Sequence, residues 1–171
     1  MVVIKIHFPL FTPVDSSFPY PPGVKTIRIV RHPVDSFYSY LVYMKRAPAR
    51  HIAKEELIDL ISSWKRFEQY WNNQPNVVTF LYEDIFKSPV KKLTQILQAI
   101  GYQVPRKKVV EAVRKFPPQG DILKHIDRFH REDLKIIKRQ LKDSMLKYGY
   151  HIPKKYLKPR KTWKQNKIKK T

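Results

Sequence analysis

Cysteine is absent from the sequence, glycine occurs only four times, and no apolar run approaches the ~18 residues that a membrane-spanning helix needs. Without cysteine, a disulfide framework and zinc sites built on thiolate ligands are excluded. The stretch before Pro9 is too short for a secretory signal peptide and lacks its small-residue cleavage pattern. We therefore expect neither a membrane span nor a signal peptide in these residues.

Acidic residues are scarce as well. The chain carries 35 Lys and Arg against 14 Asp and Glu, which gives a formal net charge of +21. Nine of the basic residues, and no acidic one, lie between Lys154 and Lys170. We predict one folded domain over residues 1–153 and a basic, flexible tail over residues 154–171. A field of this sign favours polyanions such as nucleotides, nucleic acid or acidic glycans, and the tail is one expected point of contact with them.

Short β-branched runs alternate with segments of helical periodicity in the predicted domain. We expect strands at 2–8, 26–30 and 77–81, and helices at 33–46, 54–72, 89–100, 105–115 and 131–147. Such alternation indicates an α/β fold with a mostly parallel sheet. Because ligands of these folds bind beyond the carboxyl ends of the strands, the informative residues are His7, Arg31 and Tyr82, each at or just after a strand end.

The second predicted strand delivers Arg31 to the edge of the sheet, and Pro33 then suits the first position of a helix. Asp35 and Ser39 follow at helical spacing, so the three polar residues can share one face. An arginine and a hydroxyl beside a helix N-terminus make a good phosphate site, because the dipole and the free N–H groups there favour anions. A capped helix with an ordinary surface arginine fits the same pattern about equally well.

Lys5 and His7 lie two positions apart in the first predicted strand, so their side chains point to the same face. A cation beside the imidazole lowers its pKa and keeps it neutral, as a general base requires. A lone histidine at a strand end is more often structural. Tyr82 follows the third strand, where its ring could stack on a base or its hydroxyl could meet a phosphate. Glu83 and Asp84 come next, and we expect them to face opposite ways, as neighbouring strand residues do.

These segments resemble the sulfotransferases, which use 3′-phosphoadenosine 5′-phosphosulfate (PAPS) as co-substrate. Arg-x-Pro-x-Asp-x-x-x-Ser after a strand looks like the segment with which that family holds the 3′-phosphate of PAPS. The resemblance implies that Arg31 and Ser39 are phosphate ligands and that Asp35 holds the loop. Lys5-Ile6-His7-Phe8-Pro9 is similar to the Lys-Thr-His-Leu/Phe-Pro stretch of the cytosolic-type enzymes, with Ile6 in place of Thr. By that resemblance His7 is the catalytic base and Lys5 contacts the transferring group.

Two further segments carry the resemblance. The family has a Tyr-Glu-Asp at the strand end where Tyr82 lies, which implies a role for Tyr82 in positioning the nucleotide. Arg114-Lys115 resembles the Arg-Lys-Gly stretch that closes over the 3′-phosphate, although Phe116 replaces the glycine and Ile122 replaces the tryptophan of a later Gly-Asp-Trp. An ordinary charged helix end explains Arg114 and Lys115 about equally well.

Sulfotransferases bind the 5′-phosphosulfate with an N-terminal Pro-Lys-Ser-Gly-Thr-Thr loop, and this sequence contains no such segment. Two explanations stay open. The chain is a fragment of a longer enzyme, which we favour because Lys5 and His7 occur together, or it is a degenerate paralogue that keeps the 3′-phosphate half of the site. In both cases we expect a P-loop-like, three-layer α/β fold with a mostly parallel sheet that lacks its first strand and phosphate loop.

The resemblance implies transfer of a sulfuryl group from PAPS to a hydroxyl or amine of a small-molecule or glycan acceptor, in the cytoplasm and without a metal. We expect little activity from this chain alone. A nucleic-acid or other polyanion-binding protein is one rival interpretation, based on the charge. A non-catalytic module that binds adenosine 3′,5′-bisphosphate is another. A metal site is not supported, because His125 and His130 are five residues apart and do not share a helix face.

Overall fold

The computed structural model describes residues 25–44, 52–119 and 122–158. The predicted strand at 2–8 lies outside these ranges, and with it Lys5 and His7. The prediction that these two side chains share one face, and the roles that follow from it, therefore stay predictions.

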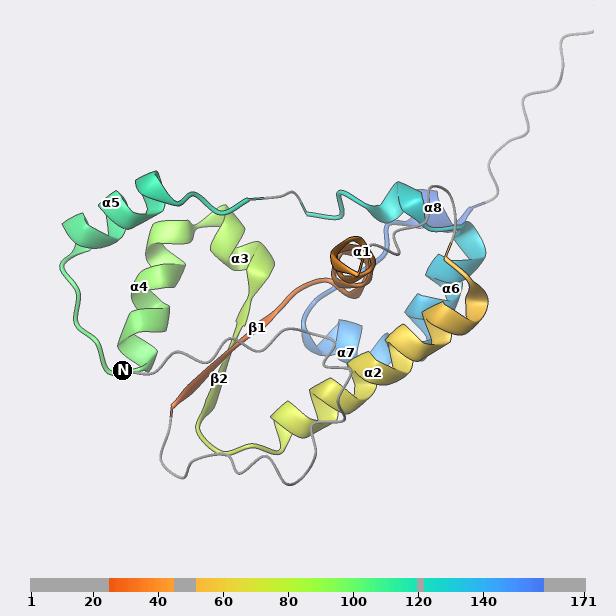
Figure 1. The fold of residues 1–171 in the computed structure, drawn as a ribbon, viewed down its shortest axis with the longest axis horizontal. Helices are drawn as coiled ribbons and strands as arrows, with labels where there is room; N and C mark the ends of the chain where they lie inside the picture. The colour runs from red at the N-terminus through yellow and green to blue at the C-terminus, as the bar shows by residue number, and fades with distance from the viewer. Residues whose placement is uncertain (1–24, 45–51, 120–121, 159–171) are drawn as a thin grey trace, which may run out of the picture.

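Two parallel strands lie at the centre of the described chain (Figure 1). Strand β1 (Thr26–Val30) pairs with β2 (Val77–Leu81) in a register that runs from Thr26 opposite Val77 to Val30 opposite Leu81. Both strands have the bounds that the sequence predicts. The mixed α/β class and the parallel pairing are thus confirmed, while helices make up most of the described residues around a sheet that has two strands there.

The predicted helices correspond to α1 (Pro33–Tyr43), α2 (Lys54–Asn72), α4 (Pro89–Ala99), α5 (Arg106–Lys115) and, in place of one long helix, α6 (Arg131–Gln140) and α7 (Lys142–Lys147). Outside the predicted ranges lie α3 (Tyr82–Lys87), a 3-10 turn η1 (Ile126–Arg128) and α8 (Lys154–Leu157).

Two local expectations were wrong. The predicted helix at 131–147 is divided at Leu141, whose backbone (φ −110°, ψ 21°) separates α6 from α7. Glu83 and Asp84 lie in the first turn of helix α3 instead of in a strand.

The core lies on one side of the strands, between α1, α2, α6 and α7 (Figure 1). Along α2, side chains at three- and four-residue steps are buried: Leu57, Leu60, Ile61 and Trp64. Four more buried side chains come from α6, α7 and the residue between them: Leu134, Ile137, Leu141 and Met145. Burial of these side chains is the main stabilising contribution that the described chain offers.

Helices α4 and α5 form a separate pair on the other side of the strands, where α3 packs on α4 and α4 packs on α5 (Figure 1). Within this described pair, α4 buries no residue and α5 buries only Val109. We call residues 89–115 the α4–α5 lobe.

The first residues of the predicted tail form helix α8, which packs on α6. Tyr156 and Leu157 of α8 lie partly buried against the core. The later residues of the predicted tail, 159–171, lie outside the described ranges.

Candidate functional site

The carboxyl end of β1 leads directly into a cluster of polar side chains at the start of α1. The guanidinium of Arg31 donates a hydrogen bond from Nη1 to Ser39 Oγ at 3.0 Å, and its Nη2 lies 3.9 Å from Asp35 Oδ2. The predicted sharing of one face by the three residues is therefore confirmed. Because Ser39 accepts from Arg31, its own O–H proton is left to donate to a further group.

Tyr82 joins this cluster from the neighbouring strand end. The centre of its ring lies 4.8 Å from the guanidinium carbon of Arg31, within the range of a cation–π contact. Its hydroxyl donates to the backbone carbonyl of Gln119. The structure thus brings together Arg31, Ser39 and Tyr82, three of the residues that the sequence singled out.

The N-terminus of α1 offers fewer free donors than the sequence suggested. Pro33 has no N–H, and the N–H of Val34 donates to Nδ1 of His32 at 3.3 Å. Burial lowers the pKa of His32 to about 4, so the ring is neutral near pH 7 and Nδ1 can accept. His32 therefore caps the helix itself. An anion at this end would depend mainly on the side chains of Arg31 and Ser39 and on the helix dipole.

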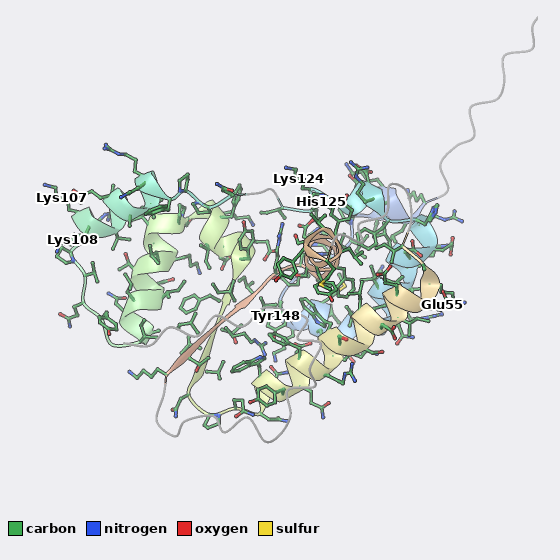
Figure 2. All side chains as sticks on the ribbon, viewed as in Figure 1. Glu55, Lys107, Lys108, Lys124, His125 and Tyr148 are labelled. Atoms are coloured by element: carbon green, nitrogen blue, oxygen red, sulfur yellow. The ribbon has the colours of Figure 1, made fainter. Side chains whose placement is uncertain are left out.

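Asp35 is fully buried and serves the fold. Its carboxylate accepts the backbone N–H of Leu123 at 2.6 Å and that of His125 at 3.3 Å. The imidazole of His125 stacks on the ring of Tyr38 with 4.3 Å between ring centres, beside α1 (Figure 2). This matches the expectation that Asp35 holds a loop, although the loop it holds is the segment around 123–125. The sequence carried no sign of this pairing.

Glu83 is a second buried carboxylate at the site. One of its oxygens accepts the backbone N–H of His32 at 2.8 Å, and the other accepts the hydroxyl of Tyr150 at 2.7 Å. Asp84 instead pairs with Lys92 at 3.0 Å on the surface. The two acids do face different ways, as expected, but they do so from the first turn of a helix.

Tyr150 was not recognised from the sequence, although the glycine before it offered a signal. Gly149 has φ +68°, and the N–H of Tyr150 donates to the carbonyl of Met145 at 2.7 Å. This left-handed ending of α7 turns the chain back toward the site. Burial and the hydrogen bond to Glu83 raise the pKa of Tyr150 above its ordinary value, so its hydroxyl keeps its proton.

Arg114 and Lys115 lie apart from this cluster, exposed on the last turn of α5. The ammonium of Lys115 is 5.4 Å from the centre of the Phe116 ring. The chain that follows then reaches Gln119, whose carbonyl binds Tyr82. The structure therefore brings the segment after the basic pair to the site, but leaves the pair itself on the surface.

The described ranges hold no group of three or more His, Asp or Glu side chains that could bind a metal ion. No helix within them is long and apolar enough to cross a membrane.

Of three comparisons with known proteins, one found a match. No curated protein and no solved structure matches the chain. The family model described as "Sulfotransferase domain" matches residues 3–120, which include the Lys5–His7 segment, Arg31, Ser39, Tyr82 and the Arg114-Lys115 pair. This match spans well over half of the 171 residues. The chain therefore belongs to the sulfotransferase domain family.

Proposed function

We propose that this protein acts in the transfer of a sulfuryl group from PAPS, and that Arg31, Ser39 and Tyr82 form the subsite for the 3′-phosphate of the nucleotide. The observation that carries the proposal is the 3.0 Å hydrogen bond between Arg31 and Ser39 at the start of α1, with the ring of Tyr82 against the same guanidinium.

The chemistry of the three side chains suits a doubly charged phosphate. The side chain of Arg31 is only 23% exposed and an arginine is always charged, so it offers a fixed, partly desolvated cation. Ser39 has an O–H to donate, and the positive end of the α1 dipole adds to the attraction. Asp35 lies 3.9 Å from the guanidinium and offsets part of its charge, while directing it toward Ser39.

In the proposed reaction, the S–O bond between the sulfuryl group and the bridging oxygen of PAPS breaks as a bond forms to an acceptor oxygen or nitrogen. His7 takes the proton of the acceptor, and Lys5 offsets negative charge on the sulfuryl oxygens. The acceptor is a small molecule or a glycan with a free hydroxyl or amine. Positioning and charge stabilisation account for catalysis of this kind, as in phosphoryl transfer. The proposal includes a P-loop-like, three-layer arrangement for the whole fold, without a metal.

Thermal unfolding with adenosine 3′,5′-bisphosphate tests the subsite. A ligand at 100 times its Kd stabilises the folded chain by about 2.7 kcal/mol, which is several degrees in Tm for a chain of this size. We expect Arg31→Ala to abolish the rise and Ser39→Ala to reduce it. Adenosine 5′-monophosphate, which lacks the 3′-phosphate, is the matched control ligand and should give a much smaller rise that Arg31→Ala leaves unchanged.

The same experiment separates the rival function. Polyanion binding is favoured by the exposed cations of α5, which include Lys107 and Lys108 at the far end of the α4–α5 lobe (Figure 2). Equal stabilisation by random oligonucleotides, unaffected by Arg31→Ala, would favour that function over the proposed one. Sulfuryl transfer that persists in His7→Ala would contradict the role of His7.

A further inference from the structure

The Glu83 carboxylate joins three segments that are far apart in the sequence. It lies in the first turn of α3 and is only 6% exposed. Through His32 N–H it binds the turn between β1 and α1, and through the hydroxyl of Tyr150 it binds the chain after α7. The two donors, at 2.8 and 2.7 Å, supply the hydrogen bonds that a buried carboxyl group requires.

Hydrogen bonds hold both polar groups of the peptide unit between Arg31 and His32. The N–H of this unit belongs to His32 and donates to Glu83 at 2.8 Å. Its carbonyl belongs to Arg31 and accepts the hydroxyl of Ser36 at 3.3 Å. Because both polar groups are hydrogen bonded, the peptide plane between Arg31 and His32 cannot rotate freely. The direction in which the Arg31 side chain leaves the backbone is therefore fixed.

The opposite wall of the subsite depends on the same carboxylate. Tyr82 directly precedes Glu83 in α3, and its ring faces the Arg31 guanidinium at 4.8 Å. Tyr150 holds the far side of the arrangement, because its hydroxyl lies 2.7 Å from Glu83 and 3.1 Å from the carbonyl of Val30, the residue before Arg31. One buried acid and one half-buried phenol thus fix the backbone on both sides of Arg31.

We infer that Glu83 and Tyr150 are positioning residues for nucleotide binding. They hold Arg31 and Tyr82 in the geometry that receives the 3′-phosphate, without touching the ligand themselves. This inference rests on the proposed function. Glu83 receives a role although it is not a ligand of the 3′-phosphate. Tyr150 receives one although it lies beyond residues 3–120, the region that the family model matches.

The readout is the 3′-phosphate increment, defined as the Kd of adenosine 5′-monophosphate divided by the Kd of adenosine 3′,5′-bisphosphate, measured by calorimetry on the full chain. We expect Tyr150→Phe to lower the increment about 3- to 10-fold, since one hydrogen bond of about 1 kcal/mol is lost from the arrangement. Glu83→Ala should lower it at least about 10-fold, because the His32 N–H and the Tyr150 hydroxyl both lose their partner.

Two further variants separate the loss of these hydrogen bonds from other effects of substitution. In Glu83→Gln, the amide carbonyl can accept from His32 N–H and the amide N–H can donate to the Tyr150 oxygen, while the phenol donates to Val30. This variant should keep most of the increment. Tyr148→Phe is the matched control, because it also removes a hydroxyl, the one that accepts from Arg28, but without contact to the Arg31 peptide. It should lower stability and leave the increment unchanged.

The outcomes separate this inference from the function on which it rests. If Arg31→Ala removes the increment while Tyr150→Phe and Glu83→Ala change only the melting temperature, the positioning role is wrong and the subsite stands. If Glu83→Gln behaves like Glu83→Ala, charge and not geometry matters, which also overturns the inference. A wild-type increment near one that Arg31→Ala does not alter overturns the proposed function and the inference together. Should Glu83→Ala not fold, Tyr150→Phe and Glu83→Gln still decide.

Discussion

The two sides of the sheet are built differently. On one side, α1, α2, α6 and α7 enclose nearly all of the buried apolar residues, and Arg31 of the β1–α1 turn hydrogen bonds to Ser39 of α1 there. On the other side, the α4–α5 lobe buries Val109 alone among its described residues, and α5 exposes five cations beside one acid.

The two pairs of predicted phosphate ligands fall on different sides of this division. Arg31 and Ser39 hydrogen bond to each other beside the buried carboxylate of Asp35, whereas Arg114 and Lys115 are exposed at the end of a helix that hardly contributes to the core. The packed side therefore fixes the positions of its polar side chains, whereas the lobe contributes charges whose positions are hardly fixed. Arg31 should provide selectivity for a 3′-phosphate, and the lobe a general attraction for anions.

The largest expected contrast is in stability. Leu134→Ala on α6 removes a side chain that is 1% exposed, and we expect it to lower the free energy of unfolding by about 2–5 kcal/mol. Leu97→Ala on α4 is the matched control, since this leucine is only half-buried and should cost ~1 kcal/mol. Urea unfolding of both variants measures the difference. Equal losses would mean that the lobe belongs to the same cooperative core, which contradicts the division drawn here.

The same division explains how far the sequence alone could go. The bounds of β1, α2 and β2 were predictable, because short β-branched runs mark the strands, apolar residues at a period of 3.6 mark the helix, and turn residues separate them. The division between α6 and α7 was not predictable, since the apolar periodicity continues through Leu141. Helix α3 was missed because nothing local distinguishes the end of a strand from the first turn of a short helix when both carry polar residues.

A smaller contrast is expected in the response to acid. The pKa of His32 is lowered by burial from 6.5 to about 4 in the folded chain, so the unfolded chain binds a proton there that the folded chain does not. Stability is therefore complete above pH 6.5 and falls as the pH drops toward 4, by about 2 kcal/mol between pH 7.5 and pH 5. The lobe contains no histidine and should not contribute.

Urea unfolding at the two pH values measures this loss, and His32→Asn is the control. Asparagine can still cap Val34 N–H but does not titrate, so most of the pH dependence should disappear. An unchanged pH dependence in His32→Asn would show that other groups carry it. His125, whose pKa burial also lowers, would then be the next candidate.

The candidate site was predictable in part, for a related reason. Arg31, Asp35 and Ser39 lie on one helix, where spacing in the sequence determines spacing in the structure. Glu83, Tyr150 and the segment around Leu123 reach the site through contacts between residues 51 to 120 positions apart. No local pattern encodes such distances. The family resemblance indicated which residues belong together, but not which of them hold the others in place.

The smallest expected effect comes from the basic pair of the lobe. Arg114 and Lys115 are exposed, so Arg114→Ala and Lys115→Ala should each change the free energy of unfolding by less than ~0.5 kcal/mol.

If these residues assist the nucleotide through charge alone, each variant should weaken binding of adenosine 3′,5′-bisphosphate about 2- to 5-fold at low salt. That loss should vanish at 0.5 M NaCl, because salt screens exposed charges within ~4 Å. The loss caused by Arg31→Ala should persist, since its guanidinium is partly buried and hydrogen bonded. Calorimetric titrations at the two salt concentrations distinguish the cases. A salt-resistant loss of affinity in Arg114→Ala would show that the end of α5 closes onto the bound nucleotide. The lobe would then hold the ligand by direct contact as well as by charge, which contradicts the division drawn here.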